Sequence, residues 1–158
     1  MGKSKYEWWS FALAMIRKYP ARSQKLKALR QQNVTASVSG MPHAGGASRT
    51  AEAIALRELP KHEQQKYEAV HTAILRTESM KESRLRMDVI RKTLWGSYKI
   101  AGAAYALNIS DSTAQLYRWD FVMMVGVAHD LITEEEYQEE RLKRLGKKKS
   151  LNTSDCKL

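Results

Sequence analysis

Apolar side chains recur at spacings of three and four residues along most of this chain, which is the period of an α-helix. The first example runs from Tyr6 to Tyr19, where Trp9, Leu13 and Ile16 lie on one stripe. No segment of useful length alternates apolar and polar residues in the manner of a half-buried strand. The sequence therefore predicts an all-α fold.

The same period divides the chain into segments. Pro20 is expected to stop or bend the first helix, because its ring clashes with the preceding turn and it has no N–H group. The expected helices cover residues 6–19, 21–32, 51–58, 61–77, 83–95, 98–107, 111–131 and 134–145. Residues 33–48, NVTASVSGMPHAGGAS, show no sustained period and predict a flexible linker, and the tail 146–158 is expected to be disordered.

The charge of the chain restricts the classes of partner. The formal net charge is +10 over 158 residues, which favours polyanions, although a solvated basic surface without a partner is the other interpretation. Residues 1–31 hold eight basic side chains and one acidic side chain, and residues 61–95 hold eight basic and five acidic. No apolar run approaches the roughly 18 residues of a membrane span, so we expect a cytoplasmic protein with no membrane partner.

Few residues suggest a cofactor or an enzyme. Cys156 is the only cysteine, which excludes a disulfide scaffold and a cysteine-built zinc site. The four histidines are far apart and the linker glycines match no nucleotide-binding motif. The acidic run that begins at Glu134 is explained by the start of a helix, where negative charge is favoured. We expect no catalytic residues, no metal and no cofactor.

The most informative segment is residues 100–119, IAGAAYALNISDSTAQLYRW. Asn108 tolerates the left-handed conformation that a tight turn requires, and Ser110 is placed to cap the helix that follows. Small side chains allow the two helices to cross closely, and larger ones hold their angle; these residues are Ala103, Ala104, Leu107, Ile109, Ala114 and Tyr117. The pattern predicts a helix-turn-helix whose second helix enters the major groove of DNA.

This hypothesis assigns two sets of contacts. Bases are contacted from the outer side of the second helix, by Asp111, Ser112, Gln115, Leu116 and Trp119. Phosphates are contacted by Lys99, Ser110, Arg118, Arg84, Arg86, Arg91 and Lys92. Gln115 can form two hydrogen bonds with adenine. Leu116 and Trp119 have a second interpretation, since apolar side chains at these positions also suit packing beneath the helix at 134–145 or against a second subunit.

Four parts of the chain follow from these assignments. Residues 1–32 form an aromatic and basic N-terminal helical segment, and residues 33–49 form the linker. Residues 50–132 form a helical DNA-binding domain with the helix-turn-helix at 98–131, and residues 133–158 form a charged helix with a disordered tail. Oligomerisation or polymerase contact through residues 6–29 is a further hypothesis, based on their aromatic and basic character.

The run from Leu85 to Leu131 resembles the C-terminal domain of phage late transcriptional activators of the RinA/ArpU type. The similarity is sharpest at Ser110–Ala114, which reads S-x-x-T-A, and at the run WDFV that begins at Trp119. That family also has an aromatic-rich first helix, here Tyr6-Glu7-Trp8-Trp9, and a Ser/Gly-rich connector, here Val38 to Ser48. The resemblance implies a helix-turn-helix similar to sigma region four, which binds promoter DNA and engages host RNA polymerase at the nucleoid.

Two alternatives from other classes remain open. Small terminase subunits, which package DNA, also join a helix-turn-helix to an oligomerising helical region. A helical adaptor whose hairpin contacts only protein is the third interpretation. We expect a non-enzymatic regulator that binds double-stranded DNA, with a possible homo-oligomer.

Overall fold

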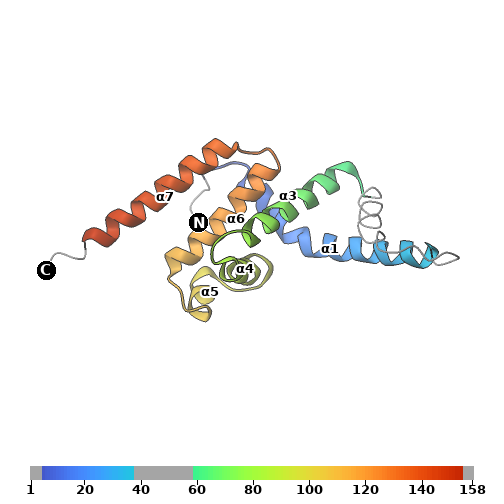
Figure 1. Cartoon of the computed structure of the whole chain (residues 1–158), viewed down its shortest axis with the longest axis horizontal. Coiled ribbons are helices and arrows are strands. Elements are labelled where there is room, and N and C mark those ends of the chain that lie inside the picture. Colours follow the sequence, from blue (N-terminus) through green and yellow to red (C-terminus); the bar gives the residue numbers. More distant parts are fainter. Residues whose placement is uncertain (1–4, 38–58, 155–158) are drawn as a thin grey trace.

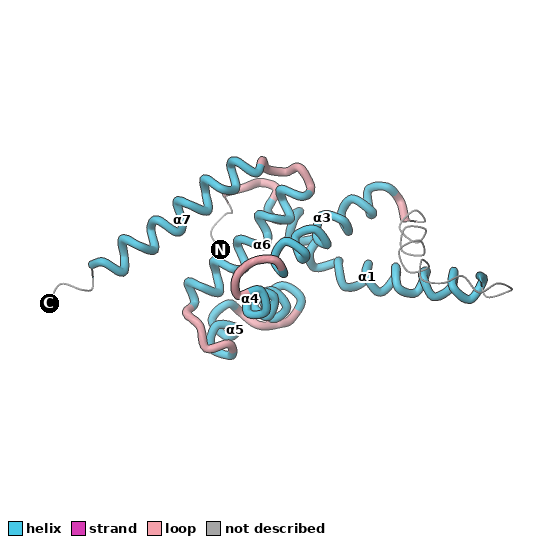
Figure 2. Tube along the Cα trace, in the orientation of Figure 1, coloured by secondary structure: helices cyan, strands magenta, loops and turns pink. Residues whose placement is uncertain are grey.

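The computed structural model describes residues 5–37 and 59–154, and within them the side chains of residues 5–31 and 59–146. These parts of the chain form helices and no strand, which confirms the all-α prediction (Figures 1 and 2). The elements are α1 (Trp9–Ser37), α3 (Lys61–Glu78), α4 (Ser83–Ile90), the π-helical turn η1 (Arg91–Trp95), α5 (Ile100–Ala106), α6 (Asp111–Ala128) and α7 (Glu134–Ser154). In Figure 1, α1 and α7 extend toward opposite ends of the molecule.

Helix α6 is the centre of the fold and contacts α1, α3, α4, α5 and α7. Its first turns have an exposed outer side, whereas every residue from Trp119 to Gly126 is buried. A helix that is apolar on all sides is stable only when other elements surround it. Gly126 permits this packing, because a Cβ atom there would lie 2.6 Å from the ring of Trp8.

Three clusters of apolar side chains hold the helices together. The largest joins α1, α3, α4, η1, α6 and α7, and includes Met15, Val70, Ile90, Phe121 and Tyr137. A second, smaller cluster joins α1 to the start of α3, and a third lies between α4, α5 and α6. The third cluster packs α4, α5 and the first half of α6 into a compact unit.

Pro20 lies inside α1, so residues 9–37 form one helix and not the two expected on either side of the proline. Because Pro20 has no N–H group, the carbonyl of Ile16 loses its usual donor in the helix. The indole Nε1 of Trp95 donates to that oxygen at 2.8 Å. A contact from η1 therefore replaces the missing bond.

Other helix boundaries also differ from the predicted ones. Residues 33–37, expected in the linker, continue α1, while residues 38–58, with the rest of the linker and the helix expected at 51–58, lie outside the described residues. The tail expected to be disordered is helical as far as Ser154. Helix α6 ends at Ala128 and not at residue 131, and α5 is limited to Ile100–Ala106.

Three turns between helices contain a residue in the left-handed conformation. These residues are Glu82 with φ 57°, Asn108 with φ 56° and Asp130 with φ 59°. Asn and Asp adopt this conformation more readily than other residues that carry a Cβ atom. The left-handed turn predicted at Asn108 is confirmed.

Candidate nucleic-acid interface

The turn between α5 and α6 is built from local hydrogen bonds. The N–H of Ile109 donates to the carbonyl of Ala104 at 3.0 Å. Ser110 caps α6 as predicted, since its Oγ accepts from the N–H of Thr113 at 3.2 Å. These bonds fix the point at which the chain enters α6.

Small side chains bring α5 and α6 close together. Ala104 and Ala114 have no exposed surface, and Val89 of α4 completes the contact. Leu107 and Ile109 pack at the edge of the same cluster. The predicted packing of this hairpin is thus present, and it holds the start of α6 at the surface of the molecule.

The residues expected to contact bases divide into two groups. Asp111, Ser112 and Gln115 are exposed, whereas Leu116 is partly buried against the main core. Trp119 is only 6% exposed, so its assignment as a base contact is wrong. Accessible positions are therefore confined to the first turns of α6.

Helix α7 explains the burial of Trp119. Two residues of α7 contact the ring of Trp119. The ring of Tyr137 lies 6.2 Å from it, and the guanidinium of Arg144 lies 4.3 Å from its centre. This is the second interpretation given for Trp119 from the sequence, namely packing beneath the C-terminal helix. The apolar surface of Trp119 therefore packs against α7 and stabilises the fold.

The residues expected to contact phosphates also differ in their exposure. Arg84, Arg91 and Lys99 are exposed, and Arg91 makes only a long ion pair of 3.4 Å with Asp88. Lys92 is partly buried, with its ammonium group 4.8 Å from the centre of the Tyr98 ring. Cations of α4, η1 and the start of α5 thus remain accessible.

The side chain of Arg86 is mostly buried, so its assignment as a phosphate contact is wrong. Its guanidinium donates to Asp120 at 2.9 Å and lies 4.2 Å from the centre of the Tyr117 ring. The side chain is 12% exposed. A cation held between a buried carboxylate and an aromatic ring serves the packing of α4 on α6.

Asp120 is the centre of a network that was not predicted from the sequence. Its carboxylate is 1% exposed, accepts a hydrogen bond from the hydroxyl of Tyr137 at 2.8 Å, and forms an ion pair with Arg141 at 3.3 Å in addition to Arg86. Burial, with the nearby charge of Asp120 as the second cause, raises the pKa of Tyr137 well above its ordinary value. The network joins α4, α6 and α7. No local signal in the sequence distinguishes this aspartate from a surface one.

Tyr117 makes the corresponding contact on the other side of Arg86. Its hydroxyl donates to the carboxylate of Glu82, the residue in the left-handed turn before α4. Burial and this hydrogen bond raise the pKa of Tyr117 to about 12. The turn before α4 is thereby attached to α6.

Arg118 differs from the other cations. It is partly buried, and its Nε has no hydrogen-bond partner within the described residues. Loss of solvation lowers the pKa of its guanidinium, and the charge of Arg17 in α1 lowers it further.

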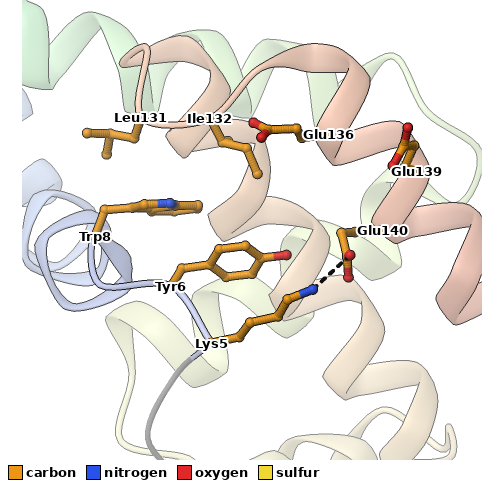
Figure 3. A pocket seen from close by; sticks show the side chains of 8 residues that line it. All are labelled: Lys5, Tyr6, Trp8, Leu131, Ile132, Glu136, Glu139 and Glu140. Carbon is orange, nitrogen blue, oxygen red and sulfur yellow. Dashed lines mark hydrogen bonds and ion pairs between the residues drawn. The ribbon is translucent and has the colours of Figure 1, made fainter.

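A pocket of about 360 Å³ lies between the residues that precede α1 and helix α7. Figure 3 shows its lining side chains, which are Lys5, Tyr6, Trp8, Leu131, Ile132, Glu136, Glu139 and Glu140. Lys5 Nζ lies 2.8 Å from a carboxylate oxygen of Glu140. Tyr6 and Trp8, which belong to the segment 6–29 with the hypothesised association role, therefore pack beside α7 and the turn that follows α6.

Comparison with family profiles, curated proteins and solved structures found no match for this chain. Among the described residues, no helix is long and apolar enough to cross a membrane. The same part of the chain contains no cluster of three or more His, Cys, Asp or Glu side chains placed to hold a metal ion.

Proposed function

We propose that this protein is a sequence-specific, non-enzymatic regulator that binds double-stranded DNA through the start of α6. The observation that carries the proposal is the exposure of Asp111, Ser112 and Gln115 on a helix that is otherwise enclosed. Recognition helices contact base edges with their N-terminal residues, so only this part of α6 needs to be accessible.

The chemistry of these three side chains suits the major groove. Gln115 can form two hydrogen bonds with adenine, and the carboxylate of Asp111 can accept from the amino group of cytosine. Ser112 can donate to or accept from several bases. A rigid turn supports this set, because Ser110 caps α6 and the Ala104–Ala114 contact holds it against α5.

Cations around the start of α6 support binding to the backbone. Arg84 lies on α4, Arg91 on η1 and Lys99 directly before α5, and all three are exposed. Contacts with phosphates supply affinity and register without reading sequence. The net charge of +10 favours such contacts and rapid association.

The sequence resemblance supports a more specific role. The protein would act at the bacterial nucleoid as a phage or prophage activator of late genes, by engaging host RNA polymerase at a promoter. In this role α6 selects the promoter, and other surfaces recruit or stabilise the polymerase.

Selection of bound duplexes from a random library tests DNA recognition directly. We expect enrichment of one sequence, and activation of transcription by host polymerase in vitro from a promoter that carries it. Binding without enrichment of any sequence would reject sequence-specific recognition. Assembly of rings without an effect on transcription would instead support the DNA-packaging alternative.

A further inference from the structure

The outer side of α5 presents an aromatic ring to solvent. Tyr105 is 90% exposed, more than any other large apolar side chain of the described residues. Ala103 and Ala104 form the buried side of the same helix. The packing of the α5–α6 hairpin therefore makes little use of the Tyr105 ring.

A second tyrosine lies along the same side of α5. Tyr98 is 49% exposed, and a Cβ atom built on Gly102 would lie 3.5 Å from a carbon of its ring. Tyr105 follows Gly102 by three residues, or about 4.5 Å along the helix axis. The ammonium group of Lys92 lies 4.8 Å from the centre of the Tyr98 ring, and the N–H of Tyr98 donates to the carbonyl of Lys92 at 3.2 Å. Tyr98 is thus held in place beside the exposed Tyr105.

Gly102 lies between the two rings and is not required by the fold. It is part of α5, and the only neighbour that a Cβ atom there would meet among the described residues is the Tyr98 ring, at an ordinary contact distance. Glycine inside a helix is destabilising relative to alanine. One use of glycine that offsets this cost is the close approach of a ligand to the backbone. Gly102 leaves the space between the two tyrosines open to such a ligand.

The charge of this part of the chain indicates the class of ligand. Residues 89–110 contain no aspartate or glutamate and hold Arg91, Lys92 and Lys99, of which Arg91 and Lys99 are exposed. Cations beside aromatic rings suit single-stranded nucleic acid, because bases stack on the rings while the cations contact the backbone. A second copy of this chain would bring the same positive charge to the surface, which opposes pairing of two such surfaces. An unpaired nucleic-acid strand is therefore the favoured occupant.

We propose that the outer side of α5 binds unpaired nucleotides, whose bases stack on Tyr98 and Tyr105. Resting on the proposed function, this inference assigns them to a DNA strand that has separated next to the duplex held by α6. Helix α5 packs against the first turns of α6 through Ala104 and Ala114, so the two surfaces adjoin. The protein would then hold both the paired and the unpaired part of its DNA.

The first test measures binding to single-stranded oligothymidine. Stacking of one base on an aromatic ring corresponds to about fivefold to 150-fold in affinity, and we expect Tyr105→Ala to lower the affinity by a factor in this range. Tyr105→Phe keeps the ring and should retain most of the affinity. Leu75→Ala is the matched control, since it removes a side chain of α3 that is 54% exposed. Equal effects of Tyr105→Ala and Leu75→Ala would overturn the proposal.

Variants of Gly102 separate ligand binding from folding. Gly102→Ala and Gly102→Leu should both raise the thermal midpoint, because alanine and leucine favour a helix more than glycine does. Only the leucine side chain is large enough to fill the space between the two rings, so only Gly102→Leu should weaken binding of oligothymidine. Equal affinities of the two variants would show that no base enters this space and would overturn the stacking surface.

Two measurements address other occupants of the outer side of α5. A dimer of the wild-type protein that dissociates in Tyr105→Ala, measured as mass in solution, would assign this side to a second copy. Tighter binding of oligouridine RNA than of oligothymidine would assign it to RNA. Either result would overturn the proposal.

Two duplexes separate this inference from the proposed function. One is the selected sequence, fully paired, and the other carries in addition a single-stranded extension of thymidines. We expect the wild-type protein to bind the extended duplex more tightly, and Tyr105→Ala to abolish this difference without a change in affinity for the paired duplex. Equal binding of both duplexes by the wild-type protein would retain the proposed function and reject this inference. Binding of oligothymidine by a protein that recognises no duplex would retain the stacking surface and reject the proposed function.

Discussion

The indole Nε1 of Trp95 donates a hydrogen bond to the carbonyl oxygen of Ile16, which lies 79 residues earlier in the chain. This oxygen is the one that the missing N–H of Pro20 leaves without its helical donor. The contact thus joins η1 to α1 at the point where α1 is weakest.

Replacement of the donor tests this relationship. Trp95→Phe keeps an aromatic ring but leaves the Ile16 carbonyl unsatisfied, which should lower the free energy of unfolding by about 1–3 kcal/mol. Denaturant unfolding measures the change. In a Pro20→Ala background the helix recovers its own N–H donor, so the same substitution should cost less. An equal cost in both backgrounds would contradict the account.

The buried carboxylate of Asp120 predicts a larger effect. Asp120→Asn removes the negative charge that faces Arg86 and Arg141, and should destabilise the protein by about 3–5 kcal/mol, because a buried cation is left unpaired. Asp88→Asn is the control. It disrupts an exposed pair with Arg91 and should cost about 0–1 kcal/mol. Similar losses in the two variants would show that burial does not control the strength of these pairs.

Features of the fold that depend on local interactions could be predicted from the sequence. Asn108 and Ser110 act on groups within a few residues of themselves, so the turn and the cap of α6 could be predicted. The packing of Ala104 against Ala114 follows from the same short segment. Local chemistry was therefore sufficient for the α5–α6 hairpin.

Residues whose environment depends on distant segments were assigned incorrectly. Arg86 appears on a basic stretch of sequence, but its partner Asp120 is 34 residues away. Trp119 lies on the outer stripe of an isolated α6, and only the return of α7 covers it. The tolerance of Pro20 within α1 could not be predicted without the contact from Trp95.

Alkaline pH should weaken the attachment of the turn before α4. Burial raises the pKa of Tyr117 from 10 to about 12, so the folded protein retains the phenolic proton more strongly than the unfolded chain. The stabilising contribution is complete below pH 10 and is lost as the pH rises to about 12. Unfolding midpoints measured across this range should therefore fall. In Tyr117→Phe the fall should be smaller, and an unchanged dependence would exclude Tyr117 as its source.

Gln115 and Lys99 should separate recognition of bases from contact with phosphate. Gln115→Ala should reduce preference at one base position by about 1–3 kcal/mol while it leaves binding to random DNA nearly unchanged. Lys99→Ala should weaken binding to all sequences and reduce the salt slope by about 0.9. Both side chains are exposed, so neither change should alter the fold. Affinities for the selected and random duplexes, measured at several salt concentrations, distinguish the two roles. Equal losses on both duplexes for Gln115→Ala would remove Gln115 from base recognition and, with it, the reason to place this side of α6 in the major groove.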